Sequence, residues 1–232
     1  MKKILFLILC LSFCFGVKAE ELNFGTNAKS AILIDADTGT IIFEKNSHER
    51  LEPASMTKMM SMLLIVENID KGIISWDEMV TTSENASSMG GSQILLETGE
   101  QMSVKDLFKG IAVASGNDAV VAMAEKIAGT EEAFVNMMNE RANSLGLQDT
   151  SFKNPHGLDT ANHYSSAYDM SLIAKELVKH EEVLNYTSIY EDYLRQNTDK
   201  QLWLVNTNKV AFKFYYKKVL SIYDIFTCAY FF

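Results

Sequence analysis

The segment EPASMTKMMS, residues 52–61, is the most informative stretch of the chain because it places Ser55 and Lys58 three residues apart where a helix begins. Residues at this spacing lie on the same face of a helix. The N-terminus of a helix also supplies free N–H groups and partial positive charge close to the serine. The sequence thus offers two interpretations. Ser55 is a helix cap beside a solvated lysine, or the two residues are a nucleophile and its general base.

A second polar cluster, Ser115-Gly116-Asn117, lies further along the chain, between two helical patterns. A hydroxyl and a carboxamide on such a turn could flank the first pair. The hydroxyl of Ser115 would relay protons, and the amide of Asn117 would hold the lysine and a substrate amide. Either motif alone is common in unrelated proteins, where a cap or a turn explains it. Together, in this order, they favour acyl transfer by a serine.

The N-terminal segment, positions 1–19, has the layout of a secretory signal peptide. Lys2 and Lys3 precede an apolar run over residues 4–15, and the segment ends at Ala19, a small residue suited to cleavage. The apolar run is too short for a comfortable membrane span. We therefore expect export across the cytoplasmic membrane, to the periplasmic or extracellular face of the cell wall, with signal peptide 1–19 removed.

Composition argues against several kinds of partner and site. Of 21 basic residues, three lie in the expected signal peptide, which leaves 18 against 30 acidic residues and a net charge of −12. A chain this acidic is a poor candidate for binding nucleic acid or an anionic membrane. Only Cys228 would remain, so no internal disulfide is expected. The four histidines lack zinc-type spacing and are interpreted as surface or loop residues, so we expect no metal and no cofactor.

Hydrophobic patterning predicts one α/β domain of the α+β type. Residues 31–35 and 40–44 predict a β-hairpin, and strand-like sequence after residue 186 suggests a sheet that closes late in the chain. Residues 83–103 are polar and predict a long surface excursion, and NPHGLD (154–159) predicts a turn. Helices are expected from EPASMTK to Gly72 and over residues 103–114, 118–128, 130–145 and 166–180.

Five segments are similar to the low-molecular-mass penicillin-binding proteins, the serine-type D-alanyl-D-alanine carboxypeptidases. They are EPASMTKMMS, VASGNDAVVAMAE, NPHGLD, YSSAYDMSLIAKEL and LVNTN, and AKSAILIDADTGTIIFEKN resembles the first hairpin of that family. The resemblance covers roughly residues 24–209. It implies a β-lactamase/transpeptidase-like fold, in which helices flank an antiparallel sheet and the site lies between the sheet and the helical region.

The resemblance also implies a role for each candidate residue. Ser55 would attack the carbonyl of the penultimate D-alanine of a peptidoglycan stem pentapeptide, which would form an acyl-enzyme and release the terminal D-alanine. Lys58 would be the general base. Ser115 would pass the proton to the leaving amine, and Asn117 would hydrogen-bond both Lys58 and the substrate backbone. β-Lactam antibiotics, which mimic the D-Ala-D-Ala end, would acylate the same serine.

One element that the resemblance implies is a K-T-G strand soon after LVNTN (204–208). The sequence contains no K-T-G, and residues 210–232 include nine Phe or Tyr but neither Gly nor Pro. We therefore expect a catalytic domain over residues 20–209 whose final strands are incomplete, through truncation or a shifted reading frame after about residue 209. An atypical aromatic tail follows, for which a membrane-interface segment is the alternative. Activity would suffer, because that strand supplies an oxyanion-hole N–H in this family.

Two other functions stay open. A class A-like β-lactamase shares the first two motifs and needs a glutamate in an E-x-x-L-N segment. Glu181-x-x-Leu184-Asn185 fits that pattern, but it lies far beyond Ser115 in the sequence and comes directly after a helical pattern, so this function ranks lower. The other is a catalytically inactive homologue that binds peptidoglycan. The missing K-T-G favours it, whereas the intact serine, lysine and asparagine motifs favour an enzyme.

Overall fold

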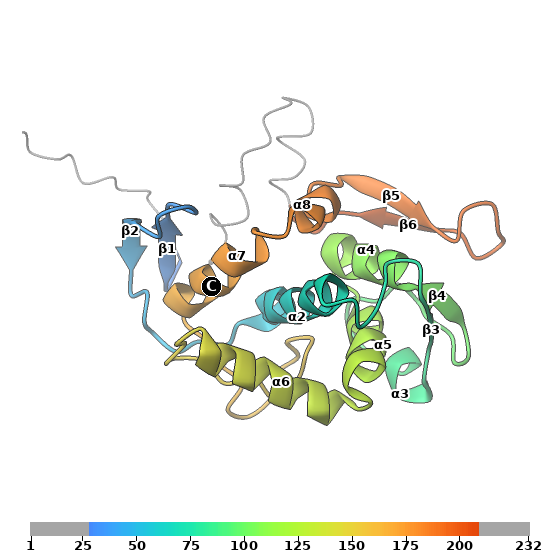
Figure 1. Ribbon diagram of the computed structural model, residues 1–232, viewed down its shortest axis with the longest axis horizontal. Coiled ribbons are helices and arrows are strands. Elements are labelled where there is room, and N and C mark those ends of the chain that lie inside the picture. The colour runs from blue at the N-terminus through green and yellow to red at the C-terminus, as the bar shows by residue number, and fades with distance from the viewer. Residues whose placement is uncertain (1–27, 209–232) are drawn as a thin grey trace, which may run out of the picture.

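The computed structural model describes residues 28–208 and shows a helical body with pairs of strands at its edges (Figure 1). The predicted signal peptide (1–19) and aromatic tail (210–232) lie outside the described residues. Within the described part of the chain, no helix combines the length and the apolar character that crossing a membrane requires.

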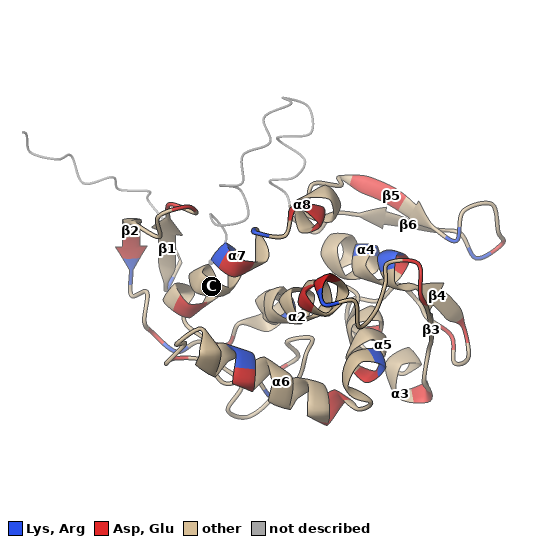
Figure 2. Ribbon diagram, in the orientation of Figure 1, with Lys and Arg blue, Asp and Glu red and all other residues tan. Residues whose placement is uncertain are grey.

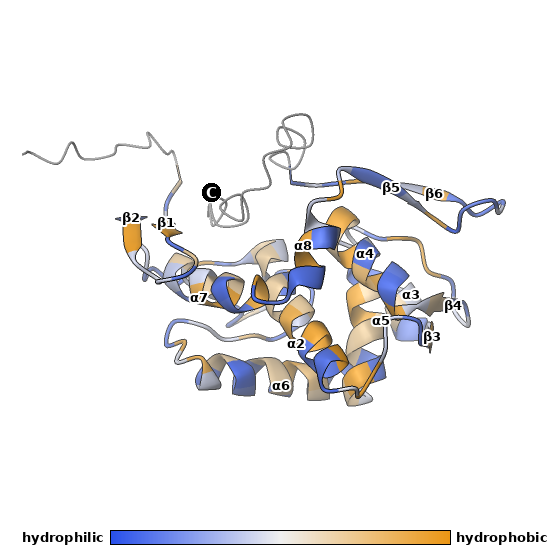
Figure 3. Cartoon of the chain, turned by 45° about the horizontal axis from the view of Figure 1, so that its top comes forward, coloured by the Kyte–Doolittle hydropathy of each residue, from blue (hydrophilic) through white to orange (hydrophobic). Residues whose placement is uncertain are grey.

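Helix α2 (Lys58–Asp70) lies at the centre of the molecule, and Figures 1 and 3 show the other long helices around it. Nine of its 13 residues are buried. A helix that is apolar on nearly every side is stable only when other elements surround it. Four helices contact it: α4 (Val104–Ala114), α5 (Asn117–Ala128), α6 (Glu131–Ser144) and α7 (Ala167–Leu177).

Capping residues in the sequence determine where these surrounding helices begin. The side-chain oxygens of Ser103, Thr130 and Ser166 each accept a hydrogen bond from the backbone N–H three residues later, at the starts of α4, α6 and α7. Such caps satisfy N–H groups that have no partner inside the helix. The predicted helices over residues 103–114, 118–128, 130–145 and 166–180 are therefore confirmed, with ends that differ by at most three residues.

The strands form three separate antiparallel pairs. They are β1 (Ala31–Ile34) with β2 (Ile41–Lys45), β3 (Met79–Thr81) with β4 (Gln101–Ser103), and β5 (Glu191–Leu194) with β6 (Leu202–Val205). The mixed α/β composition and the first hairpin are confirmed.

A single sheet closed by the late strands is not what the structure shows. Strands β5 and β6 pair with each other and pack against α4, whereas β1 packs against α7 on another side of the molecule (Figure 1). Among residues 28–208, no strand lies between the two pairs to join them, so each pair is closed only by its own local hydrogen bonds.

The segment over residues 83–103, predicted as a surface excursion, is partly buried. After the short helix α3 (Glu84–Ser87), Ile94 and Leu96 are 0% and 4% exposed. The buried carboxylate of Asp118, at the start of α5, accepts hydrogen bonds from the backbone N–H groups of both residues, each at 3.0 Å. The surface prediction was wrong for these two residues because the partner that anchors them, Asp118, lies on a helix more than 20 residues later in the chain.

Charged residues are spread over most elements of the fold. In Figure 2, segments coloured for Lys and Arg are scattered and interleaved with acidic ones along the ribbon. The ion pairs of Lys105 with Asp77 and of Lys200 with Glu97 join exposed groups, and exposed pairs of this kind contribute little to stability. The fold is held mainly by the apolar core around α2.

Candidate active site

Ser55 lies in a short 3-10 turn, η1 (Ala54–Thr57), here called the serine turn, which continues directly into α2. The residue before it, Ala54, has a φ of +46°, a left-handed conformation that is uncommon for residues other than glycine. Ser55 is exposed, whereas Thr57 and Lys58 are buried. Among the described residues no side chain caps the turn or α2, so Ser55 is not a helix cap. The turn instead presents its hydroxyl at the surface.

Lys58 is buried directly beside this hydroxyl. Its Nζ lies 3.3 Å from Ser55 Oγ and donates a second hydrogen bond, of 2.7 Å, to the carbonyl oxygen of His156. The residue is only 3% exposed, and this burial lowers the pKa of Lys58 from 10.5 to about 8. A lysine with such a pKa is partly neutral near pH 7, and the neutral amine is the form that can take a proton from a serine.

The loop over residues 151–165, here called the support loop, holds the serine turn and the start of α2. The Pro155 carbonyl accepts a hydrogen bond of 2.6 Å from Ser61 Oγ, and His163 Nε2 lies 2.8 Å from Thr57 Oγ1. Two backbone hydrogen bonds between Leu51 and Ser165 close the same junction. These contacts join segments that are far apart in the sequence.

His163 is a neutral structural residue of this junction. The backbone N–H of Lys153 donates to its Nδ1, so the neutral ring carries its proton on Nε2 and donates to Thr57. Burial lowers the pKa of His163 to about 4, which keeps the ring uncharged near pH 7. His156 and His163 are loop residues as expected, but both are buried, and neither spacing nor composition indicates their role.

Gly157 of the support loop makes the closest backbone approach to the serine turn. Its φ is +89°, and a Cβ atom added there would overlap the carbonyl group of Ala54. Only glycine combines that backbone conformation with that contact.

We therefore expect Gly157→Ala to lower the free energy of unfolding by about 3 kcal/mol or more, from backbone strain plus steric overlap. The matched control is Gly146→Ala, because Gly146 has a similar φ of +74° but nothing within 4 Å of an added Cβ. That variant should lose about 1 kcal/mol. Urea unfolding of both variants measures the difference, and equal losses would contradict the contact.

Ser115 and Asn117 lie at the junction of α4 and α5. Ser115 ends α4 in the left-handed conformation, with φ 58°, and within the described residues its hydroxyl makes no hydrogen bond. The Asn117 side chain donates to the Gly90 carbonyl at 2.7 Å, and its backbone N–H donates to the Ser92 carbonyl at 2.7 Å.

The predicted hydrogen bond from Asn117 to Lys58 is not present in the structure. The Lys58 amine instead bonds to Ser55 and to the support loop. Asn117 and Leu158 of the support loop both lie close to Gly91. A Cβ atom added to Gly91 would lie 2.7 Å from Asn117 Nδ2 and 3.6 Å from Leu158 Cδ2. The side-chain amide and the backbone N–H of Asn117 together hold residues 90–92.

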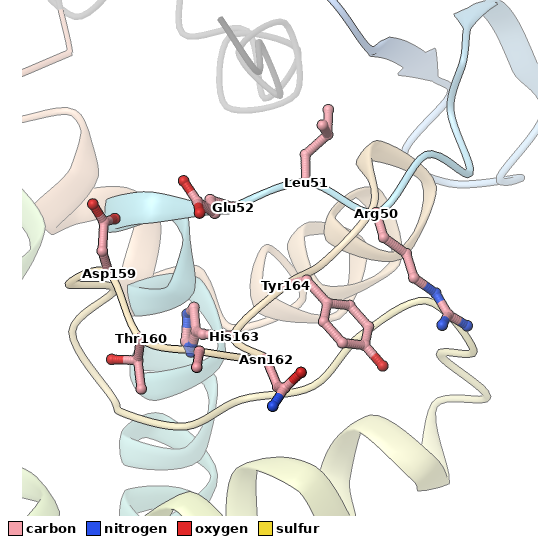
Figure 4. Close-up of a pocket in the computed structure, with 9 residues that line it drawn as sticks. Arg50, Leu51, Glu52, Asp159, Thr160, Asn162, His163 and Tyr164 are labelled. Carbon is pink, nitrogen blue, oxygen red and sulfur yellow. The ribbon is translucent and has the colours of Figure 1, made fainter.

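A cavity of about 500 Å³ lies beside the support loop (Figure 4). Its lining consists of residues 50–52 and 159–164 and does not include Ser55 or Lys58. Glu52 and Asp159 lie at one end, and the Arg50 guanidinium lies 5.1 Å from the centroid of the Tyr164 ring at the other. The cavity therefore flanks the candidate site and does not contain it.

Glu181, the residue that would support a β-lactamase, lies in the first turn of α8 (Glu181–Thr187) and is exposed. It makes no hydrogen bond to Ser55 or Lys58. Residues 28–208 contain no group of three or more His, Cys, Asp or Glu side chains arranged to hold a metal ion.

Comparison with known proteins places this chain in a family. The chain matches the D-alanyl-D-alanine carboxypeptidase family over residues 17–219. It is 63% identical over 200 residues to the D-alanyl-D-alanine carboxypeptidase DacF of Bacillus subtilis, which covers 86% of this chain and 51% of that protein. It is 40% identical over 198 residues to DacA of Escherichia coli, which covers 79% of this chain and 49% of that protein.

Solved structures agree with the sequence comparison. The D-alanyl-D-alanine carboxypeptidase DacD of Francisella tularensis superimposes with a TM-score of 0.77 at 30% identity, over 83% of this chain and 58% of that one. Penicillin-binding protein 5 of Haemophilus influenzae gives 0.75 at 35% identity, over 80% and 54%. The expected penicillin-binding fold class is confirmed, and the chain spans about half the length of the curated relatives it matches. The chain belongs to the D-alanyl-D-alanine carboxypeptidase family.

Proposed function

We propose that this chain is a serine peptidase that removes the terminal D-alanine from peptidoglycan stem pentapeptides. The observation that carries the proposal is the pair of Ser55 and Lys58. An exposed hydroxyl lies 3.3 Å from a buried amine whose pKa is lowered to about 8. The D-alanyl-D-alanine carboxypeptidases to which the chain is similar support the choice of substrate.

The proposed reaction gives a role to Ser55, Lys58 and Ser115. Neutral Lys58 takes the proton of Ser55, and the serine oxygen attacks the carbonyl of the penultimate D-alanine. N–H groups at the start of the serine turn stabilise the oxyanion. Ser115, whose hydroxyl has no partner within the described residues, passes a proton to the leaving amine of the terminal D-alanine. Water then hydrolyses the ester and restores Ser55.

The proposed partners and location follow from this reaction. The partners are a stem peptide ending in D-Ala-D-Ala and β-lactam antibiotics, which would acylate Ser55 and leave slowly. The proposed location is outside the cytoplasmic membrane, on the cell-wall side, after removal of signal peptide 1–19. The leader-like layout of the first residues supports this location.

The absence of a K-T-G segment from the sequence lowers the rate that we expect. In this family that strand supplies one oxyanion donor, and the loss of one such donor costs roughly a hundredfold in rate. We therefore expect slow acylation of Ser55 by the 232-residue chain.

The experiment compares two peptides with the full chain. One ends in D-Ala-D-Ala and the other in D-Ala-L-Ala, and the released amino acid is quantified over hours. We expect release of D-alanine from the first substrate alone. After proteolysis of the protein, mass spectrometry should find an acyl adduct on the fragment that contains Ser55. Binding of the first peptide with neither release nor adduct would favour the inactive homologue. Rapid penicillin turnover that is lost in Glu181→Gln would favour the β-lactamase.

A further inference from the structure

The ring of His156 is held at both of its nitrogen atoms, although it touches neither Ser55 nor Lys58 through its side chain. Nδ1 accepts a hydrogen bond of 3.1 Å from the backbone N–H of Leu158. The proton of the neutral ring therefore lies on Nε2. That atom is 3.5 Å from Oε1 of Glu131, the first residue of α6. The His156 side chain is 7% exposed and that of Glu131 is 27% exposed.

Glu131 behaves as a partner of this ring and not only as an acidic residue at the start of a helix. The 3.5 Å contact with His156 is the largest of the influences that lower the pKa of the Glu131 carboxyl. Its second oxygen lies 3.5 Å from the Asn85 amide in the segment that follows β3. The half-buried carboxylate thus joins α6 to the support loop.

The backbone of His156 connects this pair to Lys58. Its carbonyl oxygen accepts the 2.7 Å hydrogen bond from the lysine, the shorter of the two bonds that the amine makes. The next residue, Gly157, lies against Ala54 of the serine turn. Asn154 Oδ1 accepts hydrogen bonds from the N–H groups of His156 and Gly157, at 3.3 and 2.6 Å. Rotation of the peptide group after His156 would therefore displace the amine of Lys58.

We infer that Glu131 is a positioning residue, which fixes the His156 ring and, through the His156 carbonyl, holds the Lys58 amine beside Ser55. The inference rests on the proposed function for its effect on rate. Its structural content, a defined environment for Lys58, is independent of that function.

Glu132 provides a matched control for this inference. It lies in the same first turn of α6 and has the same favourable interaction with the helix dipole. It is exposed, and among the described residues it has no hydrogen bond or ion pair. Glu131→Ala and Glu132→Ala should therefore lose similar amounts of helix stability, but only the first removes the contact with His156.

The first measurement separates positioning from binding. The acylation rate of the full chain is measured over a range of concentrations of a fluorescent penicillin. The fit gives two separate quantities, the limiting rate and the half-saturating concentration. We expect Glu131→Ala to lower the limiting rate about tenfold, with the half-saturating concentration unchanged, because a displaced base slows chemistry more than binding. Glu131→Gln, which keeps an acceptor for Nε2–H, should recover most of the rate. Equal rates in Glu131→Ala and Glu132→Ala would overturn the inference.

The second measurement does not require acylation. The chain is labelled with [13C]lysine, and the Cε resonance of Lys58 is assigned by its loss in Lys58→Met. We expect this resonance to move in Glu131→Ala and to keep its position in Glu132→Ala. An unchanged resonance in Glu131→Ala would overturn the inference even if the chain is acylated. A moved resonance in a chain that no penicillin acylates would leave the positioning role intact and contradict the proposed function.

Discussion

Ser55→Ala is expected to abolish covalent labelling of the chain by a fluorescent penicillin. Among the described residues, the serine hydroxyl is the exposed group that the buried Lys58 amine contacts, and alanine leaves no nucleophile at that position. The side chain is exposed and makes a single hydrogen bond of 3.3 Å, so the free energy of unfolding should change by less than about 0.5 kcal/mol. Denaturing gels and intact mass report the label, and urea unfolding reports the stability.

A second serine variant makes this result interpretable. Ser88 is exposed and its hydroxyl makes one hydrogen bond, to the Asn85 carbonyl, so Ser88→Ala removes a comparable side chain away from the lysine. This variant should be labelled at the wild-type rate. A penicillin adduct that persists in Ser55→Ala would show that another residue is the nucleophile. Absence of label on correctly folded wild-type chain would contradict the enzymatic proposal itself.

Lys58→Met is expected to lower the acylation rate by about a thousandfold, the range typical of a lost general base. It should also change the pH dependence. With a pKa of about 8, the neutral fraction of Lys58 falls tenfold for each pH unit below that value, so the wild-type rate should rise from pH 6 and level off above about pH 8. The variant should show no such rise. Stopped-flow or gel-based acylation between pH 6 and 9 measures both effects.

The same substitution should increase stability near neutral pH. Lys58 binds its proton less readily in the folded chain, where its pKa is about 8, than in the unfolded chain, where its pKa is 10.5. The charged lysine therefore destabilises the fold fully below about pH 8, and this cost disappears as the pH rises toward 10.5. The cost is roughly 3 kcal/mol, and loss of two hydrogen bonds offsets part of the gain. We expect Lys58→Met to gain about 1 kcal/mol in free energy of unfolding at pH 7.

The exposed Lys71 provides the control for both effects. Its amine lies 4.0 Å from Glu67 at the surface, so Lys71→Met removes a lysine without removing a buried charge. This variant should keep the wild-type rate, pH profile and stability to within about 0.5 kcal/mol. A loss of acylation in Lys71→Met equal to that in Lys58→Met would mean that lysine content, and not the buried base, governs the rate.

The parts of the fold that could be predicted are those whose signals are local. Helix starts follow from single capping side chains such as Ser103 and Thr130, and the spacing of Ser55 and Lys58 places them on one face of a turn. Neither inference requires a partner elsewhere in the chain. The same local character explains why the first hairpin was predicted correctly.

The parts that could not be predicted depend on distant partners. The burial of Ile94 requires the Asp118 carboxylate, and the positions of His156 and His163 require a loop folded against the serine turn. Asn117 was expected to bond to the lysine, but its side chain donates to the carbonyl of Gly90, 27 residues earlier in the chain. No pattern of residue types within a short window contains these pairings.

The hydrogen bonds between the support loop and the serine turn also determine when this site can exist. Lys58 and His156 are separated by 98 residues, and closing a flexible chain of that length costs roughly 4 kcal/mol in entropy. Helix α2 is stable only when the surrounding helices cover it, and its lysine acquires its buried environment only when the later loop docks. In the proposed reaction, Ser55 would therefore lack its general base until the support loop docks. We therefore expect the proposed reactivity of Ser55 to appear late in folding, after the support loop has bonded to Lys58.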